Sequence, residues 1–417
     1  MVQTLPANTD GRLTTCRSCN AAELIPILSL GNTPLANALR TEEQLSLPEA
    51  VFPLDVVFCP RCTLVQITET VSPELLFGEY AYFSSFSDTM LQHAQQLVER
   101  MRLERRLSAD SLAMEIASND GYLLQYYHAA GVPVLGIEPA RNIAEVARQR
   151  GISTVCEFFG IDCARRLAES GRHADVLHAN NVLAHVADLN GFVAGIKALL
   201  DDDGVAVLES PYLKDLLDNV EFDTIYHEHL CYYSLTALDQ LFRRHGLQVD
   251  NVERIAIHGG SLRLYVTHIG TTAPALAVSE LLNEESSWVA DPDVYRSFGN
   301  RVSQLRVELL ALLQQLKGEG HTIVAYGASA KGSTLLNYFG IGREILDYVV
   351  DRSTIKQGRY TPGTQLPILD PSRLLESPPD YVLLLTWNFQ EEILKQQAAY
   401  RAGGGKFIIP IPDVAVV

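Results

Sequence analysis

Four consecutive residues near the middle of the chain, Tyr226-His227-Glu228-His229, carry side chains that donate, accept or hold a proton. This proton-transfer cluster contains no aliphatic residue, and acid/base chemistry requires such groups to converge. Because an imidazole titrates near neutral pH, either histidine is suited to remove a proton from a weakly acidic C–H bond. The cluster therefore predicts catalysis by proton transfer.

Metal binding and burial in a polar core are the alternatives to catalysis for the two histidines of this cluster. Zinc proteases place two histidines four positions apart on a helix, whereas His227 and His229 are two positions apart, and no third ligand is evident nearby. On a strand the two side chains would share a face. A metal site is thus disfavoured, while burial of one or both imidazoles in a polar core stays open.

Two cysteine pairs near the N-terminus have the spacing of a zinc site. Cys16-Arg17-Ser18-Cys19 and Cys59-Pro60-Arg61-Cys62 are separated by 39 residues, and a closed tetrahedral zinc site requires four thiolates. The intervening segment has several prolines and few large apolar residues, so we expect metal binding to supply its folding energy. Unliganded thiol turns or a redox pair are the alternatives. Because a catalytic zinc keeps an open position, the predicted role is structural and remote from catalysis.

A strand, a polar loop and a helix follow one another after residue 111. Leu112-Ala113-Met114-Glu115-Ile116 predicts a buried strand, and Ala117-Ser118-Asn119-Asp120-Gly121 leads into a helical pattern over 122–130. A second strand over 134–138 ends in Glu138, 17 positions after Gly121, where a carboxylate suits both hydroxyls of a ribose. This order predicts a site for an adenosyl ligand at the helix N-terminus.

The glycine content of the loop bears on which ligand it holds. A dinucleotide site needs glycines where the pyrophosphate presses on the backbone, and this loop has Ala117 and Asn119, with only Gly121 retained. S-adenosylmethionine has no pyrophosphate and tolerates side chains there. The loop therefore favours S-adenosylmethionine, with an NAD-dependent oxidoreductase as the alternative.

Further strands extend the same alternation of strands and helices. Residues 174–181 and 204–209 predict two more, so we expect a doubly wound parallel sheet. Asn180 lies at the tip of the first and is predicted to contact the cofactor. The runs 252–257 and 262–268, around Gly259-Gly260, predict an antiparallel hairpin that closes the sheet.

A second α/β unit follows a polar helical stretch over 293–317. A strand over 321–326 runs into Gly327-Ala328-Ser329-Ala330-Lys331-Gly332 and then a helix, with further strands over 346–350 and 381–385. The glycine loop lacks the spacing of a P-loop. Nevertheless, Lys331, the Ser329 hydroxyl and helix-start N–H groups suit a diphosphate. A glycine turn with no ligand and an NAD site are the alternatives.

The cysteine quartet, the Glu115-to-Leu124 loop, the proton-transfer cluster, Gly259-Gly260-Ser261-Leu262-Arg263 and the Gly327-to-Gly332 loop occur together in one order. In this the chain resembles the S-adenosylmethionine-dependent sugar C-methyltransferases from Cys16 to its C-terminus. That family acts on nucleotide-linked 4-keto-deoxysugars. Its members often carry glycine where this chain has Ala117, which adds one methyl group beside the cofactor.

The resemblance implies roles for individual residues. It makes His229 the base, with Glu228 orienting it and Tyr226 bonded to the substrate or its oxyanion, and it adds Tyr80 and His185 to the active site. Ser329 and Lys331 are implied to hold the substrate's diphosphate, in a dTDP-linked sugar methylated at C-3. The expected cofactors are S-adenosylmethionine and a structural Zn²⁺ on Cys16, Cys19, Cys59 and Cys62. The residues expected around S-adenosylmethionine are Glu115, Ala117, Ser118, Asn119, Gly121, Glu138 and Asn180.

The predicted fold is α/β in three domains. A four-cysteine zinc domain spans 1–69, a Rossmann-like class I methyltransferase domain 70–283, and a second α/β domain that binds the nucleotide sugar 284–417. The net charge of −17 repels nucleic acid, and no apolar run reaches the roughly eighteen residues of a membrane span. The first residues lack the apolar stretch of a secretory signal. We therefore expect a cytoplasmic enzyme with no nucleic-acid, membrane or obligate protein partner.

Overall fold

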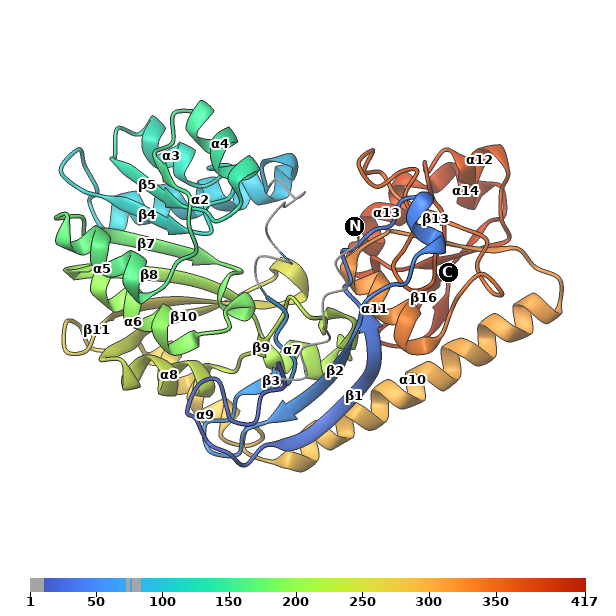
Figure 1. Cartoon of the computed structure of the whole chain (residues 1–417), viewed down its shortest axis with the longest axis horizontal. Coiled ribbons are helices and arrows are strands. Elements are labelled where there is room, and N and C mark those ends of the chain that lie inside the picture. The colour runs from blue at the N-terminus through green and yellow to red at the C-terminus, as the bar shows by residue number, and fades with distance from the viewer. Residues whose placement is uncertain (1–10, 73–75, 77–83) are drawn as a thin grey trace.

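The computed structural model describes residues 11–72, 76 and 84–417, so Tyr80 lies outside the described residues. Within these ranges the chain forms three sheets. In Figure 1 the central sheet and the C-terminal sheet lie on opposite sides, and the long strands of the N-terminal sheet run between them.

The N-terminal sheet has the order β1-β2-β3-β9, and all of its pairs are antiparallel. Its strands are β1 (Ile25–Pro34), β2 (Val51–Phe58), β3 (Val65–Ile67) and β9 (Cys231–Tyr232). The expectation that this segment holds almost no core was wrong. Leu54, Val56 and Phe58 are buried in the main hydrophobic core, because alternate residues of a strand point to the same face.

The central sheet has the order β10-β11-β8-β7-β4-β5-β6. Its strands are β4 (Ala113–Ile116), β5 (Val134–Ile137), β6 (Thr154–Val155), β7 (Ala174–Asn180), β8 (Leu200–Pro211), β10 (Leu247–Ile255) and β11 (Ser261–His268). The strands from β8 to β6 run parallel, and β11 is antiparallel to both β8 and β10. The predicted parallel sheet and its closing hairpin are confirmed, while β6 was not predicted.

Helices and short turns connect these strands. The helices are α2 (Asp88–Glu104), α3 (Leu124–Ala129), α4 (Arg141–Gln149), α5 (Ile161–Glu169), α6 (Leu189–Leu199), α7 (Leu213–Asp218) and α8 (Leu235–Arg244). The 3₁₀ turns are η1 (Glu43–Ser46), η2 (Ser84–Phe86), η3 (Leu183–His185), η4 (Phe222–Thr224) and η5 (Ile257–Gly259). Helix α2 starts at Ser87, whose side chain accepts a hydrogen bond from the Met90 N–H and satisfies one of the free donors of the first turn.

The C-terminal sheet has the order β14-β13-β12-β15-β16-β17 and is parallel except for β17. Its strands are β12 (Ile323–Tyr326), β13 (Val349–Val350), β14 (Ile368–Leu369), β15 (Tyr381–Leu384), β16 (Lys406–Ile409) and β17 (Ala415–Val416). Its helical elements are α11 (Ala330–Phe339), α12 (Arg373–Glu376), η6 (Trp387–Phe389), α13 (Gln390–Gln396) and α14 (Ala398–Ala402).

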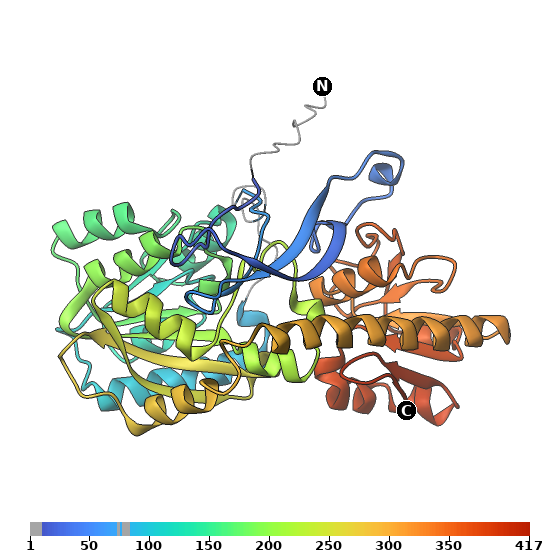
Figure 2. The ribbon, with the colours of Figure 1, turned by 90° about the horizontal axis from the view of Figure 1, so that it is seen from below.

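Helix α9 (Leu276–Glu285) and the long helix α10 (Pro292–Gly318) lead from the central sheet to the C-terminal sheet. Pro292 occupies the first turn of α10, where a missing N–H costs nothing. Figure 2 shows α10 running from beside the central sheet along the C-terminal domain. Its Arg301 donates to the backbone carbonyls of Leu217 and Asp218 at 2.9 and 2.7 Å, which ties α10 to α7.

The structure confirms the α/β fold class with a group of four cysteines, a seven-stranded central sheet and a second α/β unit. The boundaries at residues 69/70 and 283/284 stay predictions, and β9 shows that the first sheet takes a strand from the middle of the chain. Within the described ranges, none of the helices combines the length and the apolar character needed to cross a lipid bilayer.

Candidate active site and zinc centre

The loop after β4 adopts an unusual backbone. Ala117, Asn119 and Gly121 have φ angles of +52°, +48° and +79°, which place three alternate residues in the left-handed region. Alanine pays a steric cost there that glycine does not. The backbone at Ala117 is therefore strained where family members often carry glycine. Strain of this kind concentrates at ligand sites.

Glu138, directly after β5, holds this loop in place. One carboxylate oxygen accepts from the Asn119 N–H at 3.0 Å and the other from the Ala140 N–H at 2.9 Å. Burial raises the pKa of Glu138, and these two backbone hydrogen bonds oppose the rise. Because each carboxylate oxygen has a second lone pair, the group retains capacity for ribose hydroxyls.

Several polar atoms around the loop are buried without a hydrogen-bond partner. They are Glu115 Oε2, Ser118 Oγ and, at the tip of β7, Asn180 Oδ1. Burial, followed by the nearby charge of Glu138, raises the pKa of Glu115 well above its ordinary value. Since buried polar atoms are normally satisfied, these groups fit a polar adenosyl ligand such as S-adenosylmethionine.

In the proton-transfer cluster, His229 has a defined tautomer. Its Nδ1 lies 2.8 Å from the backbone carbonyl of Thr224, and a carbonyl can only accept, so Nδ1 carries the proton. Nε2 is then the basic nitrogen of the neutral ring, and the Tyr226 hydroxyl lies 3.0 Å from it. This is the arrangement expected of a general base with a hydroxyl beside it.

The other two members of the cluster point elsewhere. Glu228, expected to orient His229, instead accepts from the Asn37 side chain at 2.7 Å, so the orienting position belongs to the Thr224 carbonyl. Burial raises the pKa of Glu228, and Asn37 opposes the rise. His227 is buried and its Nε2 lies 3.1 Å from the Pro53 carbonyl, so this histidine packs against the N-terminal sheet, in agreement with the polar-core alternative.

His185, on η3 after β7, lies beside His229. Their ring centroids are 4.9 Å apart, edge to face. Burial lowers the pKa of His185 to about 4, although a hydrogen bond with the Glu228 backbone opposes the fall. The structure therefore brings His185 together with Tyr226 and His229 from two separate segments, and burial disfavours the charged form of His185.

The four cysteines of the quartet converge as predicted. Their ligand atoms all lie within 4.8 Å of one another, and the Cys16–Cys62 and Cys19–Cys59 sulfurs are 3.5 Å apart. Zinc with bonds of about 2.3 Å separates tetrahedral sulfurs by about 3.8 Å. The hydrogen bond with Cys16, followed by burial, raises the pKa of Cys62. Four thiolates this close to one another therefore require a bound cation. No other metal-binding group exists among the described residues.

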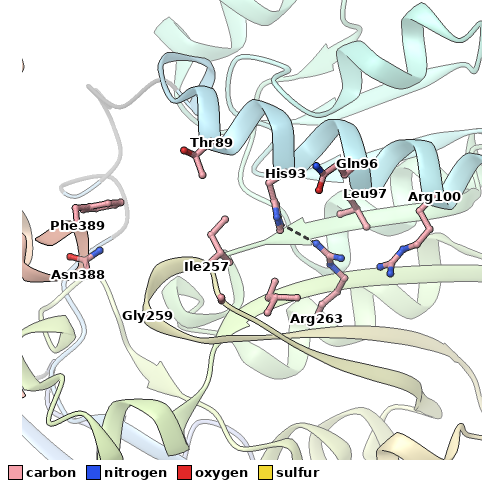
Figure 3. A pocket seen from close by; sticks show the side chains of 12 residues that line it. Thr89, His93, Gln96, Leu97, Arg100, Ile257, Gly259, Arg263, Asn388 and Phe389 are labelled. Carbon is pink, nitrogen blue, oxygen red and sulfur yellow. Dashed lines mark hydrogen bonds between the residues drawn. The ribbon is translucent and has the colours of Figure 1, made fainter. Parts of the chain in front are cut away.

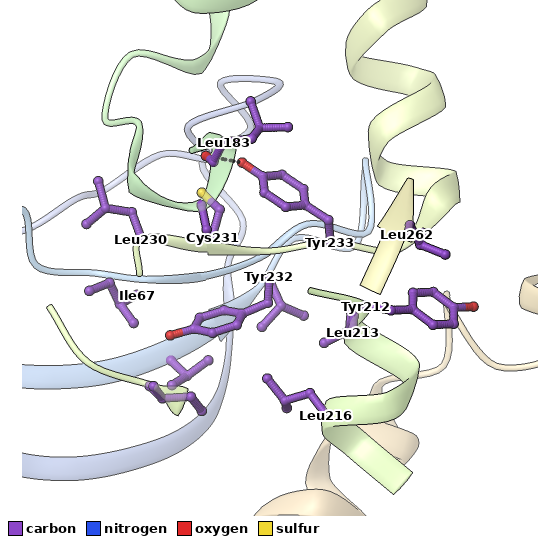
Figure 4. Close-up of a cluster of buried hydrophobic side chains, with 14 of the residues drawn as sticks. Ile67, Leu183, Tyr212, Leu213, Leu216, Leu230, Cys231, Tyr232, Tyr233 and Leu262 are labelled. Carbon is purple, nitrogen blue, oxygen red and sulfur yellow. Dashed lines mark hydrogen bonds between the residues drawn. The ribbon is translucent and has the colours of Figure 1, made fainter. Parts of the chain in front are cut away.

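The zinc centre is connected to the segment of the proton-transfer cluster through one pair of strands. Strand β3 follows Cys62 and pairs with β9, which begins two residues after His229. The Ile67 N–H also donates to the Leu230 carbonyl at 3.0 Å. Figure 4 shows Ile67, Leu230 and Tyr232 packed in one apolar cluster. The cysteines are therefore in a position to hold the segment that carries His229.

In the C-terminal domain, Ser329 caps α11 and accepts from the Gly332 N–H at 3.0 Å. The Lys331 ammonium is buried, without a hydrogen-bond partner, and lies 5.0 Å from the centroid of the Trp387 ring. These two residues thus lie together at the start of α11, as predicted.

A cavity of about 550 Å³ lies between α2, the β10–β11 hairpin and η6. Figure 3 shows His93 and Arg263 on one wall, with Asn388 and Phe389 across the opening. Arg263 is already bonded to Glu209 at 2.6 Å and to Glu253 at 3.4 Å. The positive charge of Arg263 on this wall is therefore balanced by neighbouring carboxylates. Arg263 bounds the cavity but does not offer an unpaired cation to a ligand.

Sequence reasoning missed the backbone carbonyl of Thr224 and the Asn37 amide. Every residue has a backbone carbonyl, so the role of Thr224 cannot be inferred from its residue type. Asn37 lies 191 positions from its partner Glu228. The Trp387 indole, which donates to Asp223 in the segment before the cluster, was missed as well. No pattern in the sequence signals these contacts.

Comparisons with known proteins cover all three parts of the chain. Residues 16–77 match a zinc binding domain family, 89–252 a methyltransferase domain family and 256–412 the C-methyltransferase C-terminal domain family. C-methyltransferase NovU of Streptomyces niveus is 37% identical over 410 residues, which span 96% of this chain and 96% of that protein.

Two solved structures that resemble the chain each cover less than half of it. A S-adenosylmethionine-dependent methyltransferase from Clostridium acetobutylicum ATCC 824 is 11% identical, with a TM-score of 0.35 over 43% of this chain and 92% of that chain. Magnesium protoporphyrin IX methyltransferase from Synechocystis PCC 6803 is 13% identical, with a TM-score of 0.34 over 47% and 88%.

The near-full-length match to NovU also decides between the two cofactors that the loop glycines left open, in favour of S-adenosylmethionine. With its four-cysteine zinc-binding group, its methyltransferase sheet and its C-terminal unit in one order, the chain belongs to the family of S-adenosylmethionine-dependent C-methyltransferases that includes NovU.

Proposed function

We propose that the enzyme methylates the carbon next to the ketone of a nucleotide-linked 4-keto-deoxysugar, specifically C-3 of a dTDP-linked sugar. Such a product serves the assembly of an antibiotic or a cell-surface glycan. The observation that carries the proposal is the His229 geometry, in which Nδ1 is occupied by the Thr224 carbonyl and Nε2 is left basic. A carbon becomes a nucleophile toward a methyl group only after such a base removes its proton.

The chemistry assigns a task to each group around His229. The C-4 ketone acidifies the neighbouring C–H bond, and His229 Nε2 takes that proton. The Tyr226 hydroxyl, which lies 3.0 Å from Nε2 and donates to it in the resting site, turns to donate to the oxygen on which negative charge develops. His185 serves the same site as a neutral contact to the sugar, because burial lowers its pKa to about 4.

The cofactor residues form a second group. Glu138 and Asn119 bind the ribose side, while Glu115, Ser118 and Asn180 offer the buried atoms that lack a partner. Ala117 places one methyl group beside the ligand, and Gly121 lets the loop pack against Ile152. When bound, S-adenosylmethionine supplies an electrophilic methyl group on its sulfonium.

The nucleotide of the substrate binds, in this proposal, between the central and C-terminal domains. The cavity there, about 550 Å³, is within the usual range for small ligands, and Asn388 and Phe389 at its edge adjoin Trp387. We infer that Ser329 and Lys331 hold the diphosphate at this end.

Tyr80 stays a proposed contact to the sugar, and 69/70 and 283/284 stay the proposed domain boundaries. The seven free cysteines support a reducing, cytoplasmic site of action.

The test uses the full-length zinc enzyme, S-adenosylmethionine and a panel of nucleotide-linked 4-keto sugars in deuterated water. Solvent exchange at the carbon next to the ketone and methylation are both followed by mass spectrometry. We expect His229→Gln to lower both rates by about 10²- to 10⁴-fold, with no change in the dissociation constant of S-adenosylmethionine.

A matched control is His321→Gln, because His321 is a half-exposed imidazole in the C-terminal domain. It should leave both rates unchanged. If His229→Gln exchanges deuterium at the normal rate, the base is another group. If no 4-keto sugar in the panel is methylated by the wild-type enzyme, the substrate class itself is wrong.

A further inference from the structure

The η4 turn connects the proposed base to the C-terminal domain. Its last residue, Thr224, supplies the carbonyl that bonds His229 Nδ1 at 2.8 Å. The residue before it, Asp223, is wholly buried. One Asp223 oxygen accepts from the Trp387 indole N–H at 2.7 Å, and Trp387 belongs to η6 in the C-terminal domain. The same short turn thus faces the active site on one side and another domain on the other.

Helix α11 packs on the turn as well. The Phe222 ring stacks on Phe339 with centroids 5.0 Å apart, and the Thr334 hydroxyl donates to the Ile225 carbonyl at 3.3 Å. Phe222 and Ile225 flank the Asp223–Thr224 segment on either side. The turn therefore takes its position in part from contacts that the C-terminal domain makes.

Charge adds to these contacts. The groups that face Asp223 are Glu221 on its own segment and Lys331 on α11, whose ammonium lies 5.0 Å from the Trp387 ring centroid. Burial raises the pKa of Asp223, and the charge of Lys331 followed by the Trp387 hydrogen bond opposes the rise. A buried carboxylate needs such partners, so loss of the indole N–H leaves an acceptor unpaired beside Thr224.

We propose that Trp387 and Asp223 are positioning residues for the base: their hydrogen bond fixes η4, and the fixed Thr224 carbonyl holds His229 in the tautomer with a basic Nε2. The inference rests on the proposed role of His229. Docking of the C-terminal domain, where the substrate's diphosphate is proposed to bind, then belongs to the assembly of the base. Neither Trp387 nor Asp223 needs to touch the substrate.

The experiment compares Trp387→Phe with the wild-type holoenzyme. ¹⁵N-labelled histidine in the resting enzyme reports the His229 tautomer by NMR, and deuterium exchange into the substrate reports the proton-transfer step. In the variant we expect the Nδ1–H signal to give way to a mixed population. Exchange should fall by about 10- to 100-fold, the range expected of a small misplacement of a reacting group, at unchanged affinity for S-adenosylmethionine.

Arg301→Ala is the matched control. It also removes two hydrogen bonds that connect the α10–C-terminal unit to the central domain, but these end on Leu217 and Asp218 rather than on η4. The control should keep both the His229 signal and the exchange rate. Equal losses in the two variants would mean that Trp387 supports only domain docking, and an unchanged tautomer in Trp387→Phe overturns the proposal outright.

Two further comparisons keep the result unambiguous. If Trp387→Phe does not fold, Asp223→Asn and Asp223→Ala make the same test, because the amide alone keeps an acceptor for the indole and should recover most of the rate lost in the alanine variant. No difference between them contradicts the proposal. The tautomer is read without substrate, so it tests the turn even if His229→Gln shows that another group is the base.

Discussion

Replacement of Glu138 by glutamine changes one atom of the cofactor site and affects two contacts. In the wild-type protein the Glu138 carboxylate accepts hydrogen bonds from the Asn119 and Ala140 N–H groups, one on each oxygen. The amide of glutamine has a single oxygen, so its NH₂ group must face one of these donors. One backbone N–H is left unsatisfied in a site where Glu138 itself is buried.

The size of the effect follows from these contacts. An unsatisfied buried donor costs about 1–3 kcal/mol, and a hydrogen bond to a charged acceptor contributes about 1.5–3 kcal/mol. If ribose hydroxyls bond the same carboxylate, S-adenosylmethionine should lose about 10- to 100-fold in affinity, because about 1.4 kcal/mol corresponds to a factor of ten. S-adenosylhomocysteine carries the same ribose and should lose the same factor.

Isothermal titration calorimetry of both ligands makes the measurement, with Glu145→Gln on the exposed face of α4 as the matched control. Thermal unfolding of each variant separates the lost loop contacts from the lost ligand contacts. Wild-type affinity in Glu138→Gln would refute the ribose assignment and leave Glu138 as a scaffold of the loop. A loss for S-adenosylmethionine but not for S-adenosylhomocysteine would point to the sulfonium instead.

Two further predictions concern the metal and pH. Removal of zinc by a chelator, or Cys19→Ser, should abolish methylation as well as unfold the N-terminal sheet, because β3 pairs with the strand after His229. Metal content, circular dichroism and deuterium exchange into the substrate make the measurement. A zinc-free enzyme with normal exchange would contradict the prediction. His185 should stay neutral to about pH 4. Since its pKa in the unfolded chain is about 6.5, the unfolded state binds the proton first, and stability should fall as pH drops from about 6.5 to 4, by at most about 1.4 kcal/mol per pH unit. The ring signals of His185 in an NMR titration and urea unfolding at several pH values test this, and a His185 midpoint near 6.5 would contradict it.

The features predicted best from the sequence were those that depend on residue type or on the periodicity of apolar residues. Four cysteines in two pairs named the zinc ligands, and alternating strands and helices named the central sheet, because burial on both faces makes each strand a continuous apolar run. The core of β2 was underestimated, because Pro53 directly precedes Leu54, Val56 and Phe58 and makes this run resemble an interrupted strand.

The interior of the active site was harder to predict. The family resemblance implied that Glu228 orients His229, but neighbouring residues in a turn point in different directions, and Glu228 instead bonds Asn37. The contact that sets the tautomer of His229 comes from a backbone carbonyl. Backbone groups have no residue type, and partners nearly two hundred positions apart share no local pattern.

The pairing of β3 with β9 also constrains how the chain can be divided and how it folds. The fourth strand of the first sheet is made of Cys231 and Tyr232, so a fragment that stops before them leaves the edge of β3 without its partner. Such an open edge invites pairing with another chain. The N-terminal sheet is therefore complete only after more than half of the protein has been synthesised, and its last strand comes from the segment that carries the proposed base.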